Sequence, residues 1–268
     1  MTARRRLDVE LVRRGLLSSR EQAAEAVAAG RVLVSGAPAT KAAHLVAPGE
    51  PVRVVGPPPP FVSRGGMKLD AALDRFCVEV SDRRALDAGA STGGFTDCLL
   101  QRGAAHVVAA DVGRGQLDER LRVDERVEVL DGVNVRHLAL EQVGGRPFSV
   151  VVADLSFISL RTVMPVLLGP LAEEGADAVL LVKPQFEVGR AVVSRGRGIV
   201  SDPAEWRRAL VGVGAAVTAA GAAMMGTMVS PITGAQGNVE FLLHARAHMP
   251  GGGEVPGLDE VVAEAAGG

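Results

Sequence analysis

Cysteine and aromatic residues are scarce in this sequence. The 268 residues include two cysteines, Cys77 and Cys98, no tyrosine, and only 3% aromatic residues in total. Two cysteines cannot build a disulfide framework, and their spacing suits no metal site, so we expect no metal and predict two buried thiols in a reducing cytosol. The shortage of aromatic rings limits base stacking as a means of recognition. A nucleic-acid partner would then be bound mainly through its shape and its phosphates.

The sequence also lacks a clear export or membrane segment. The N-terminal residues are basic but contain no apolar core, so we expect no signal peptide. Residues 209–229 carry no charge and are long enough to span a bilayer. However, they are mostly alanine and glycine, and Gly221 divides them. We predict a buried helix followed by a strand in a cytoplasmic protein, with a membrane-inserting segment as the alternative.

Charge is distributed unevenly along the chain. Residues 1–56 contain nine basic and five acidic residues, whereas the remainder contains 20 basic and 26 acidic residues. A basic module joined to an acidic one is typical of a domain that anchors a polyanion. We therefore expect a nucleic-acid partner despite the net charge of −2.

The N-terminal part predicts a small α+β domain. Helices are expected over 7–14 and 20–29, the second capped by Ser18-Ser19, with strands over 31–34 and 51–55. Four consecutive prolines follow Gly56 and favour a stiff polyproline spacer. The predicted divisions are 1–56 for this domain, 57–66 for a linker, 67–247 for a large domain, and 248–268 for a tail with a short helix over 258–266.

The large domain alternates between strand and helix patterns. The expected strands cover 85–87, 106–111, 127–131, 149–154 and 178–183, followed by two more over 224–230 and 238–245. The expected helices cover 95–102, 116–121, 138–143, 160–171 and 203–220, the last with Ser201 as its cap. This alternation indicates an α/β fold with a parallel sheet covered on both faces and an antiparallel pair at one edge.

Polar residues cluster where the carboxyl ends of these strands should meet, which is where open α/β sheets bind ligands. The glycine-rich stretch ALDAGASTGGF permits close backbone approach and leads into a helix. Such a loop, followed about 20 residues later by an acid, occurs in dehydrogenases and in methyltransferases; this one lacks the GxG that a pyrophosphate needs, which favours the methyltransferase. The candidate cofactor contacts are Asp87, Gly89, Ala90, Ser91, Thr92, Gly93, Gly94, Asp111, Asn134 and Asp154.

The segment RLDVELVRRGLLSSREQAAEAVAAGRVLVSG resembles the S4 RNA-binding fold. The resemblance implies a phosphate-facing side. An ordinary solvated helical face is the alternative. The residues implied in RNA contact are Arg4, Arg6, Arg14, Arg20 and Lys41.

The motifs VSRGGMKL, LDAGASTGGFT, VVADLSFISL, LVKPQFEVG and GNVEF occur in the order found in the TlyA family of ribosomal RNA 2′-O-methyltransferases, which the chain resembles from Arg4 to about Phe241. The resemblance implies a Rossmann-like class I methyltransferase domain, S-adenosylmethionine as methyl donor, and a ribose 2′-OH, of cytidine, in 30S or 50S ribosomal RNA as acceptor. It also implies a catalytic tetrad of Lys68, Asp154, Lys183 and Glu240.

The tetrad suits this chemistry, because a lysine whose pKa is lowered can act as general base toward a weakly acidic hydroxyl. Lys183 is the candidate base and Lys68 the second cation, while the two acids orient the amines. Arg64, Arg136 and Arg190 are further candidates for phosphate contact. Phe157 could stack on a flipped base or belong to the core.

Two other functions stay open at this point. One is a membrane-active, haemolysin-like protein, and the other is a ribosomal RNA-binding assembly factor with no catalytic activity. The four-proline spacer is stiffer and less polar than the linker expected in this family, which leaves the coupling between the two domains open. The arginines at 4–6 and the C-terminal helix resemble the longer family members that act on both ribosomal subunits.

Overall fold

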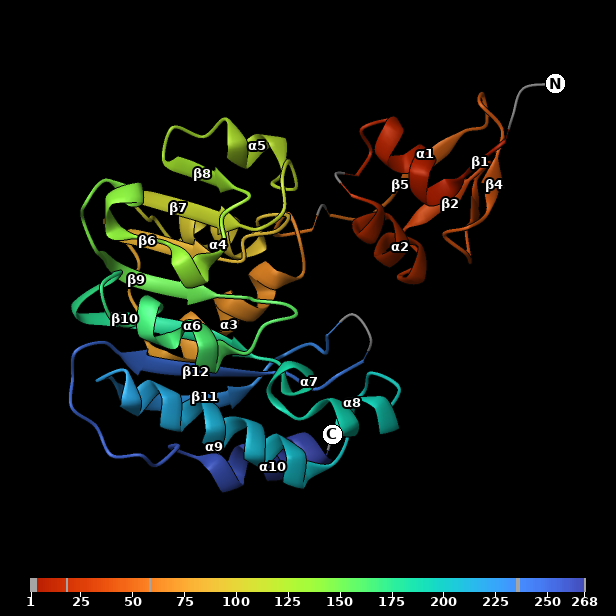
Figure 1. Cartoon of the computed structure of the whole chain (residues 1–268). Helices are drawn as coiled ribbons and strands as arrows, with labels where there is room; N and C mark the ends of the chain where they lie inside the picture. The colour runs from red at the N-terminus through yellow and green to blue at the C-terminus, as the bar shows by residue number, and fades with distance from the viewer. Residues whose placement is uncertain (1–3, 18, 58, 235–236, 268) are drawn as a thin grey trace. The chain divides into compact units, whose positions relative to one another are not determined.

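The computed structural model describes residues 4–17, 19–57, 59–234 and 237–267. By the clustering of its contacts, the chain divides into two compact units between Ser63 and Arg64. Each unit has its own hydrophobic core, and each is described separately below (Figure 1).

The N-terminal unit packs two short helices against small antiparallel sheets. Its core consists of residues such as Leu7, Leu11, Ala23 and Val32, all fully buried. Ser19 caps the second helix by accepting a hydrogen bond of 3.2 Å from the backbone N–H of Gln22, as its side-chain type predicts. The elements are β1 (Arg5–Arg6), α1 (Leu7–Arg13), α2 (Arg20–Ala28), β2 (Val32–Val34), β3 (Ala37–Pro38), β4 (Leu45–Val46) and β5 (Val52–Val54), paired as β3-β2-β5 and β1-β4.

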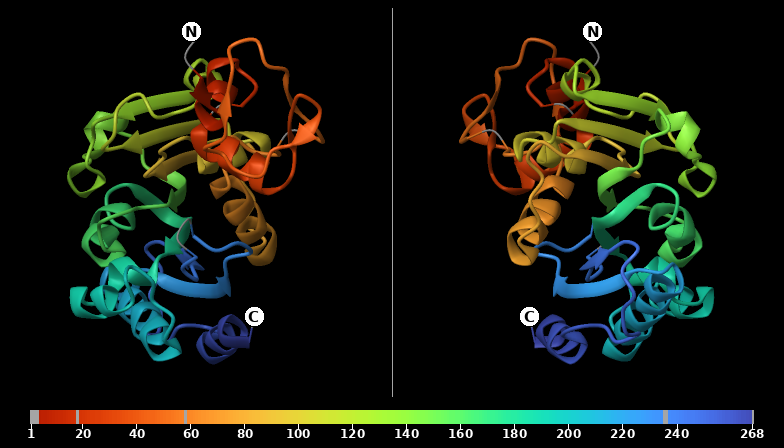
Figure 2. Two further views of the ribbon diagram at one scale, coloured as in Figure 1. Left: turned by 90° about the vertical axis from the view of Figure 1, so that its right-hand side faces the viewer. Right: turned by 90° about the vertical axis from the view of Figure 1, so that its left-hand side faces the viewer.

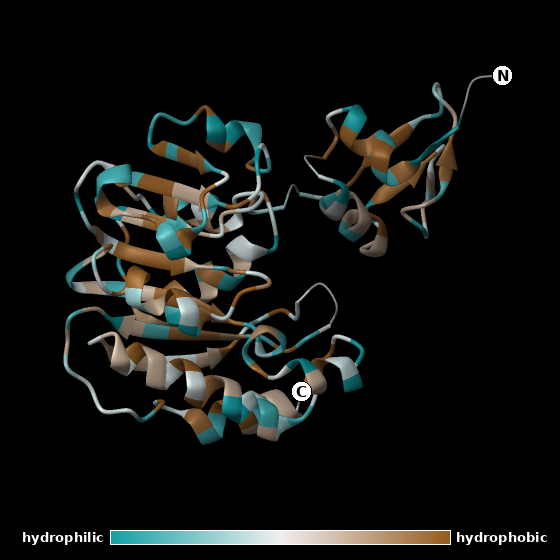
Figure 3. Ribbon diagram, in the orientation of Figure 1, coloured by the Kyte–Doolittle hydropathy of each residue, from teal (hydrophilic) through white to brown (hydrophobic). Residues whose placement is uncertain are grey.

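The second unit is built on a seven-stranded sheet in the order β11-β12-β10-β9-β6-β7-β8. Its strands are β6 (Arg84–Ala88), β7 (His106–Asp111), β8 (Val127–Asp131), β9 (Phe148–Ala153), β10 (Ala172–Val182), β11 (Ala223–Val229) and β12 (Phe241–Arg246). The central strands are apolar along most of their length, as buried parallel strands require (Figure 3). The last strand, β12, runs antiparallel to both β10 and β11, between which it lies. The expected parallel sheet with antiparallel pairing at one edge is confirmed.

Helices cover both faces of this sheet. Figure 2 shows α3 (Gly65–Phe76) on the opposite side from α6 (Leu160–Leu167) and α9 (Pro203–Ala219). The C-terminal α10 (Leu258–Gly267) packs on α9 and β11 through Val261 and Val262. The other helices are α4 (Gly94–Gln101), α5 (Glu119–Arg122), α7 (Pro184–Glu187) and α8 (Arg190–Arg195), with 3-10 turns η1 (Val135–His137) and η2 (Leu140–Val143).

Several local expectations were wrong. The cap of α9 is Asp202, not Ser201, because Pro203 takes the first helical position and the residue just before it accepts from the N–H of Ala204. The helix expected over 138–143 is replaced by the two 3-10 turns, and α7 and α8 were not expected. Cys77 is exposed because it ends α3 in a left-handed conformation, whereas Cys98 is buried.

The uncharged segment 209–229 does not form one continuous helix. It is divided between α9 and β11, with a turn at Gly221, as the buried-helix interpretation predicts. In the described part of the chain, no helix is both long and apolar enough to cross a membrane.

Candidate active site

The predicted catalytic residues meet at one edge of the large sheet. Asp154 follows β9 and Lys183 follows β10, so both lie at the carboxyl ends of parallel strands. Glu240 precedes β12, and because this strand is antiparallel its beginning lies at the same edge. Val182 pairs with Phe241, which places Lys183 and Glu240 side by side in the register. The fold thus gathers side chains that are distant in sequence.

These four side chains form two ion pairs. The Lys183 amine pairs with Oδ1 of Asp154, and it also donates a hydrogen bond of 3.1 Å to Oγ of Ser156. The Lys68 amine, from the first turns of α3, lies 2.5 Å from Oε2 of Glu240. Charge therefore balances within each pair, as buried charges require.

The two ion pairs differ in their access to solvent. The Lys68 side chain is 9% exposed and that of Glu240 is 3% exposed. The Lys183 pair is more open, since Asp154 retains about a quarter of its side-chain exposure. The two lysines themselves are similarly buried, since the Lys183 side chain is 11% exposed. The difference in access therefore lies in their partners, Asp154 and Glu240.

The glycine-rich loop after β6 approaches its neighbours too closely for other residues. A Cβ on Gly89 would lie 2.6 Å from the carbonyl oxygen of Asp154, and one on Gly93 would overlap Leu117 and Leu121. Both glycines have positive φ, of 87° and 97°. The loop therefore brings its backbone directly against the segment that carries Asp154.

Two carboxylates support this loop in different ways. Asp111, at the end of β7, accepts hydrogen bonds from the N–H groups of Ser91 at 2.9 Å and Gly113 at 2.7 Å. Asp87 is fully buried and accepts a 2.6 Å hydrogen bond from Oγ1 of Thr96, while its Oδ1 has no partner among the described residues. Burial raises the pKa of the Asp87 carboxyl to about 7.

The remaining cofactor candidates lie around the same loop. Ala90 is buried and Thr92 half-buried, Gly94 is the first residue of α4, and Ser91 is exposed with a φ of 49°. Asn134 is exposed and caps η1 by accepting from the N–H of Arg136. These residues are thus presented from the ends of three neighbouring strands.

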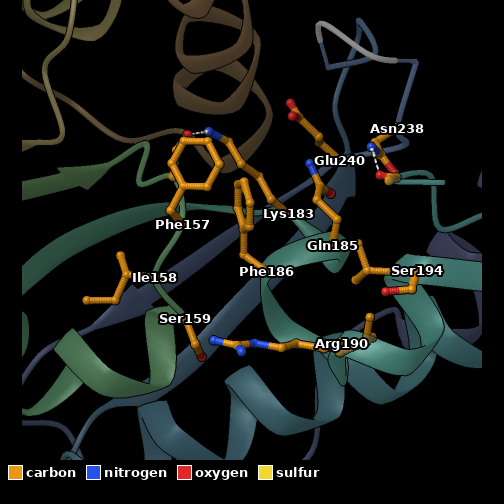
Figure 4. Close-up of a pocket in the computed structure, with 14 residues that line it drawn as sticks. Phe157, Ile158, Ser159, Lys183, Gln185, Phe186, Arg190, Ser194, Asn238 and Glu240 are labelled. Atoms are coloured by element: carbon orange, nitrogen blue, oxygen red, sulfur yellow. Dashed lines mark hydrogen bonds between the residues drawn. The ribbon is translucent and has the colours of Figure 1, made fainter. Parts of the chain in front are cut away.

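A cavity of about 790 Å³ opens beside Lys183 and Glu240 (Figure 4). It is bounded by residues 156–159, by residues 183–198 and by Asn238. Of the predicted residues, Lys183, Glu240, Phe157 and Arg190 line it, whereas Lys68 and Asp154 do not. Its volume is sufficient for a nucleotide.

An aromatic pair stands in the wall of this cavity. The rings of Phe157 and Phe186 lie 5.3 Å apart at 52°, and the Lys183 amine is 5.9 Å from the Phe186 ring (Figure 4). Phe157 is 92% exposed, so it does not belong to the core. An aromatic ring so exposed beside a cavity is available to a ligand.

In the N-terminal unit, buried acids hold several of the predicted RNA-contacting arginines. Arg6 and Arg20 pair with Asp8 at 2.9 and 3.0 Å, and Arg14 pairs with Glu10 at 2.8 Å. The Arg6 guanidinium holds the pKa of Asp8 well below its usual range. Arg6 and Arg20 still expose about half of their side chains, so their outer faces remain available to phosphates.

The other predicted RNA-contacting residues vary in exposure. Arg4 and Lys41 are exposed in the N-terminal unit, as are Arg136 and Arg190 in the second unit. Arg64 is half-buried at the start of α3.

Sequence reasoning missed two residues that organise the cavity. Glu187 is buried and bonds Ser159 and the N–H of Leu160. Asn238 is buried and uses both ends of its amide, accepting from the N–H of Val200 and donating to the carbonyl of Gly198. Both side chains join segments distant in sequence, so no local pattern reveals them.

Comparison with known proteins agrees with this architecture. Residues 61–247 match the family model of the FtsJ-like methyltransferases, and residues 5–52 match that of the S4 domain. A protein of Mycobacterium tuberculosis named 16S/23S rRNA (cytidine-2′-O)-methyltransferase TlyA is 50% identical over 98% of this chain and 97% of its own. The chain belongs to the TlyA family of ribosomal RNA methyltransferases.

Other TlyA-family comparisons differ in their extent. A protein of Campylobacter jejuni named 23S rRNA (cytidine-2′-O)-methyltransferase TlyA is 32% identical over 69% of this chain and 70% of its own. A solved structure from Streptococcus thermophilus, provisionally described as a hemolysin, is 38% identical, with a TM-score of 0.79 over 99% of this chain and 96% of its own. The expected S4-like module and Rossmann-like methyltransferase domain are confirmed, and membership of the TlyA family implies S-adenosylmethionine as methyl donor.

Proposed function

We propose that this enzyme transfers the methyl group of S-adenosylmethionine to the ribose 2′-OH of cytidine in ribosomal RNA. The proposal rests on one observation. Two ion pairs, Lys183–Asp154 and Lys68–Glu240, lie together at the edge of the sheet, between the glycine-rich loop and the cavity. The relatives from M. tuberculosis and C. jejuni are both named cytidine-2′-O-methyltransferases, and these names supply the nucleotide and the atom. Since ribosomal RNA is the substrate, we place the enzyme in the cytoplasm.

The residues around the loop fit the methyl donor. Gly89 lets the loop backbone lie directly against the segment that carries Asp154, and Asp111 presents a carboxylate where ribose hydroxyls can be bound. S-adenosylmethionine supplies a methyl group on a sulfonium centre, which is reactive toward an oxygen nucleophile. Asp111 and the loop backbone would hold the adenosyl part, and Asp154 would lie beside the sulfonium end.

The cavity fits the acceptor nucleotide. Its wall presents the Phe157 ring for a base and the Lys183 amine for a hydroxyl. Asp154 and Ser156 fix the position of that amine, which must first lose its own proton. The neutral amine would then take the proton of the 2′-OH while the oxygen bonds to the methyl carbon and the methyl–sulfur bond breaks. The Lys68–Glu240 ion pair would hold α3 against the start of β12, at the same edge of the sheet. Much of the rate would come from alignment of the reacting atoms.

The N-terminal unit would anchor the RNA. We take residues 1–56 as an RNA-binding domain, 57–66 as the linker, 67–247 as the catalytic domain, and 248–268 as the tail. Cationic side chains on each unit, exposed except for the half-buried Arg14 and Arg64, would supply the phosphate contacts. They are Arg4, Arg6, Arg14, Arg20 and Lys41 in the first, and Arg64, Arg136 and Arg190 in the second.

The proposal is tested with S-adenosylmethionine labelled in its methyl group and unmodified 30S and 50S subunits. We expect the wild type to label RNA and Lys183→Ala to lose at least a hundredfold in rate. Lys41→Ala is the matched control, because it removes the one lysine outside the tetrad, and its catalytic rate at saturating RNA should be unchanged. Equal rates for the wild type and Lys183→Ala would refute the role of this lysine.

The same experiment separates the possible substrates. The M. tuberculosis relative is named for both 16S and 23S RNA, and the C. jejuni relative for 23S RNA alone. This chain is more similar in sequence to the M. tuberculosis relative than to the C. jejuni relative, so we propose that it methylates RNA in both ribosomal subunits. Nuclease mapping of the labelled nucleotide distinguishes cytidine from other acceptors, and complete absence of label would refute the proposed function.

A further inference from the structure

Two segments that line the cavity run side by side and are joined at several points. Lys183 bonds Asp154 and Ser156, the Phe186 ring contacts the Phe157 ring, and Glu187 bonds the chain at residues 159–160. The contacts keep the same order along both segments. Residues 154–160, which we name the Phe157 arm, are therefore fixed along their length by residues 183–187. Figure 4 shows the contact between the Phe157 and Phe186 rings.

The Phe157 arm contains an unfavourable backbone conformation at its centre. Phe157 has a φ of 63°, which is rare for a bulky residue and costs on the order of 1 kcal/mol or more. Burial of the Phe157 ring cannot offset this cost in free energy, because the ring is almost fully exposed. The conformation must therefore be imposed by the contacts on either side of Phe157.

Glu187 provides the contacts on the far side. Its carboxylate accepts 2.5 Å from Oγ of Ser159 and 2.7 Å from the N–H of Leu160, at the start of α6. The Arg161 guanidinium lies 3.4 Å from the same carboxylate and also donates to the Glu187 carbonyl. Glu187 itself is only 6% exposed. A buried carboxylate with two short, charge-assisted hydrogen bonds is a firm anchor.

We propose that Glu187 is a positioning residue that holds Phe157 in place for the acceptor base before RNA binds. This inference rests on the proposed function, because it assigns the base to the Phe157 ring. Glu187 touches neither substrate nor cofactor and acts only through the arm. A ring held in advance spares the enzyme the entropy of ordering it when the nucleotide enters.

The test is a double-mutant cycle on RNA binding and turnover, measured for Glu187→Ala, Phe157→Ala and the double variant. We expect each single change to raise the KM for RNA about tenfold, the size of a lost base-stacking contact, with a smaller effect on kcat. The double variant should be no worse than Phe157→Ala, because Glu187 has nothing left to position. Glu187→Gln, which keeps an acceptor for Leu160, should restore most of the loss.

Glu205 offers a matched control. It is a buried carboxylate in the first turn of α9, 8% exposed, and it pairs with Arg208 of its own helix at 2.5 Å. Glu205→Ala should leave the KM for RNA unchanged, and all variants should bind S-adenosylmethionine with wild-type affinity in calorimetry. Additive effects of Glu187→Ala and Phe157→Ala would overturn the proposal, since they would show that Glu187 acts elsewhere. Failure of the wild type to methylate RNA would instead refute the proposed function.

Discussion

At the scale of the residue, the few lysines of this chain indicate where the candidate active site lies. Its 29 basic residues are 26 arginines and three lysines, and two of those lysines, Lys68 and Lys183, form the buried or half-buried ion pairs of the site. Arginine cannot lose its proton in a protein, whereas an amine can. The proposed role of Lys183 as a base therefore requires a lysine at this position and not an arginine.

Other residues of the site could not be predicted in this way. Glu187 and Asn238 are common residue types in unremarkable local sequences, and their roles depend on partners 27 to 40 positions away. Phe157 was ambiguous because an aromatic residue after a strand is equally compatible with burial and with exposure. Its left-handed φ and its exposed ring separate the two interpretations only in three dimensions.

Asp87 gives a prediction about pH at this scale. Burial raises its pKa to about 7, above the unfolded value of about 3.9. Between these values the folded chain keeps a proton that the unfolded chain has lost, so the stability from Asp87 falls as pH rises from about 4 to about 7. Asp87→Asn cannot ionise, so its stability relative to that of the wild type should rise between pH 4 and pH 8, by a few kcal/mol at most.

Urea unfolding at the two pH values measures this difference. Asp82→Asn, a change at an exposed aspartate, is the control and should show the same difference from the wild type at both values. If the stability of Asp87→Asn relative to that of the wild type is the same at both pH values, then the pKa of this carboxyl is not raised in the folded state.

At the scale of the element, regular strands were predicted well and short helices poorly. Strands β7 and β8 have the bounds that the sequence predicted. In β7 a continuous apolar run between polar residues allows few alternatives, and in β8 the sequence VEVLD begins with the apolar–polar alternation of a strand. The position of β12 between β10 and β11 was not predictable, because order within a sheet depends on long-range pairing. Four- to six-residue helices such as α7 and α8 contain too few turns to produce a periodic pattern.

The glycine-rich loop gives a prediction for an element. Gly93 has a φ of 97°, and a Cβ there would overlap the side chains of Leu117 and Leu121. Gly93→Ala should therefore lower the melting temperature and weaken S-adenosylmethionine binding at least tenfold. Gly144→Ala is a matched control, since Gly144 has a φ of 79° but open space around its Cβ position. The Gly144→Ala variant should lose about 1 kcal/mol of folding stability through backbone strain alone, and its cofactor binding should be unchanged.

At the scale of the whole molecule, the division of charge is the property that sequence established most directly. The basic excess of residues 1–56 lies in the unit that matches the S4 domain. Residues 57–268 are acidic in total but contain one local group of exposed arginines. Arg190, Arg195 and Arg197 are exposed, and in the part of the chain that the structure describes they have no ion-pair partner. They lie in or directly beyond α8, next to the cavity that Lys183 and Arg190 line.

These arginines predict a salt-dependent contribution to RNA binding. If Arg195 and Arg197 each neutralise one phosphate of a single-stranded segment, the double change to alanine should reduce the slope of log Kd against log salt by about 1.4. Arg75→Ala removes an exposed arginine from α3, outside the cavity wall, and should leave the slope unchanged. Filter binding of 23S RNA fragments from 50 to 300 mM salt provides the measurement. A variant that binds more weakly at every salt concentration, with an unaltered slope, would show that these arginines act through local structure and not through phosphates.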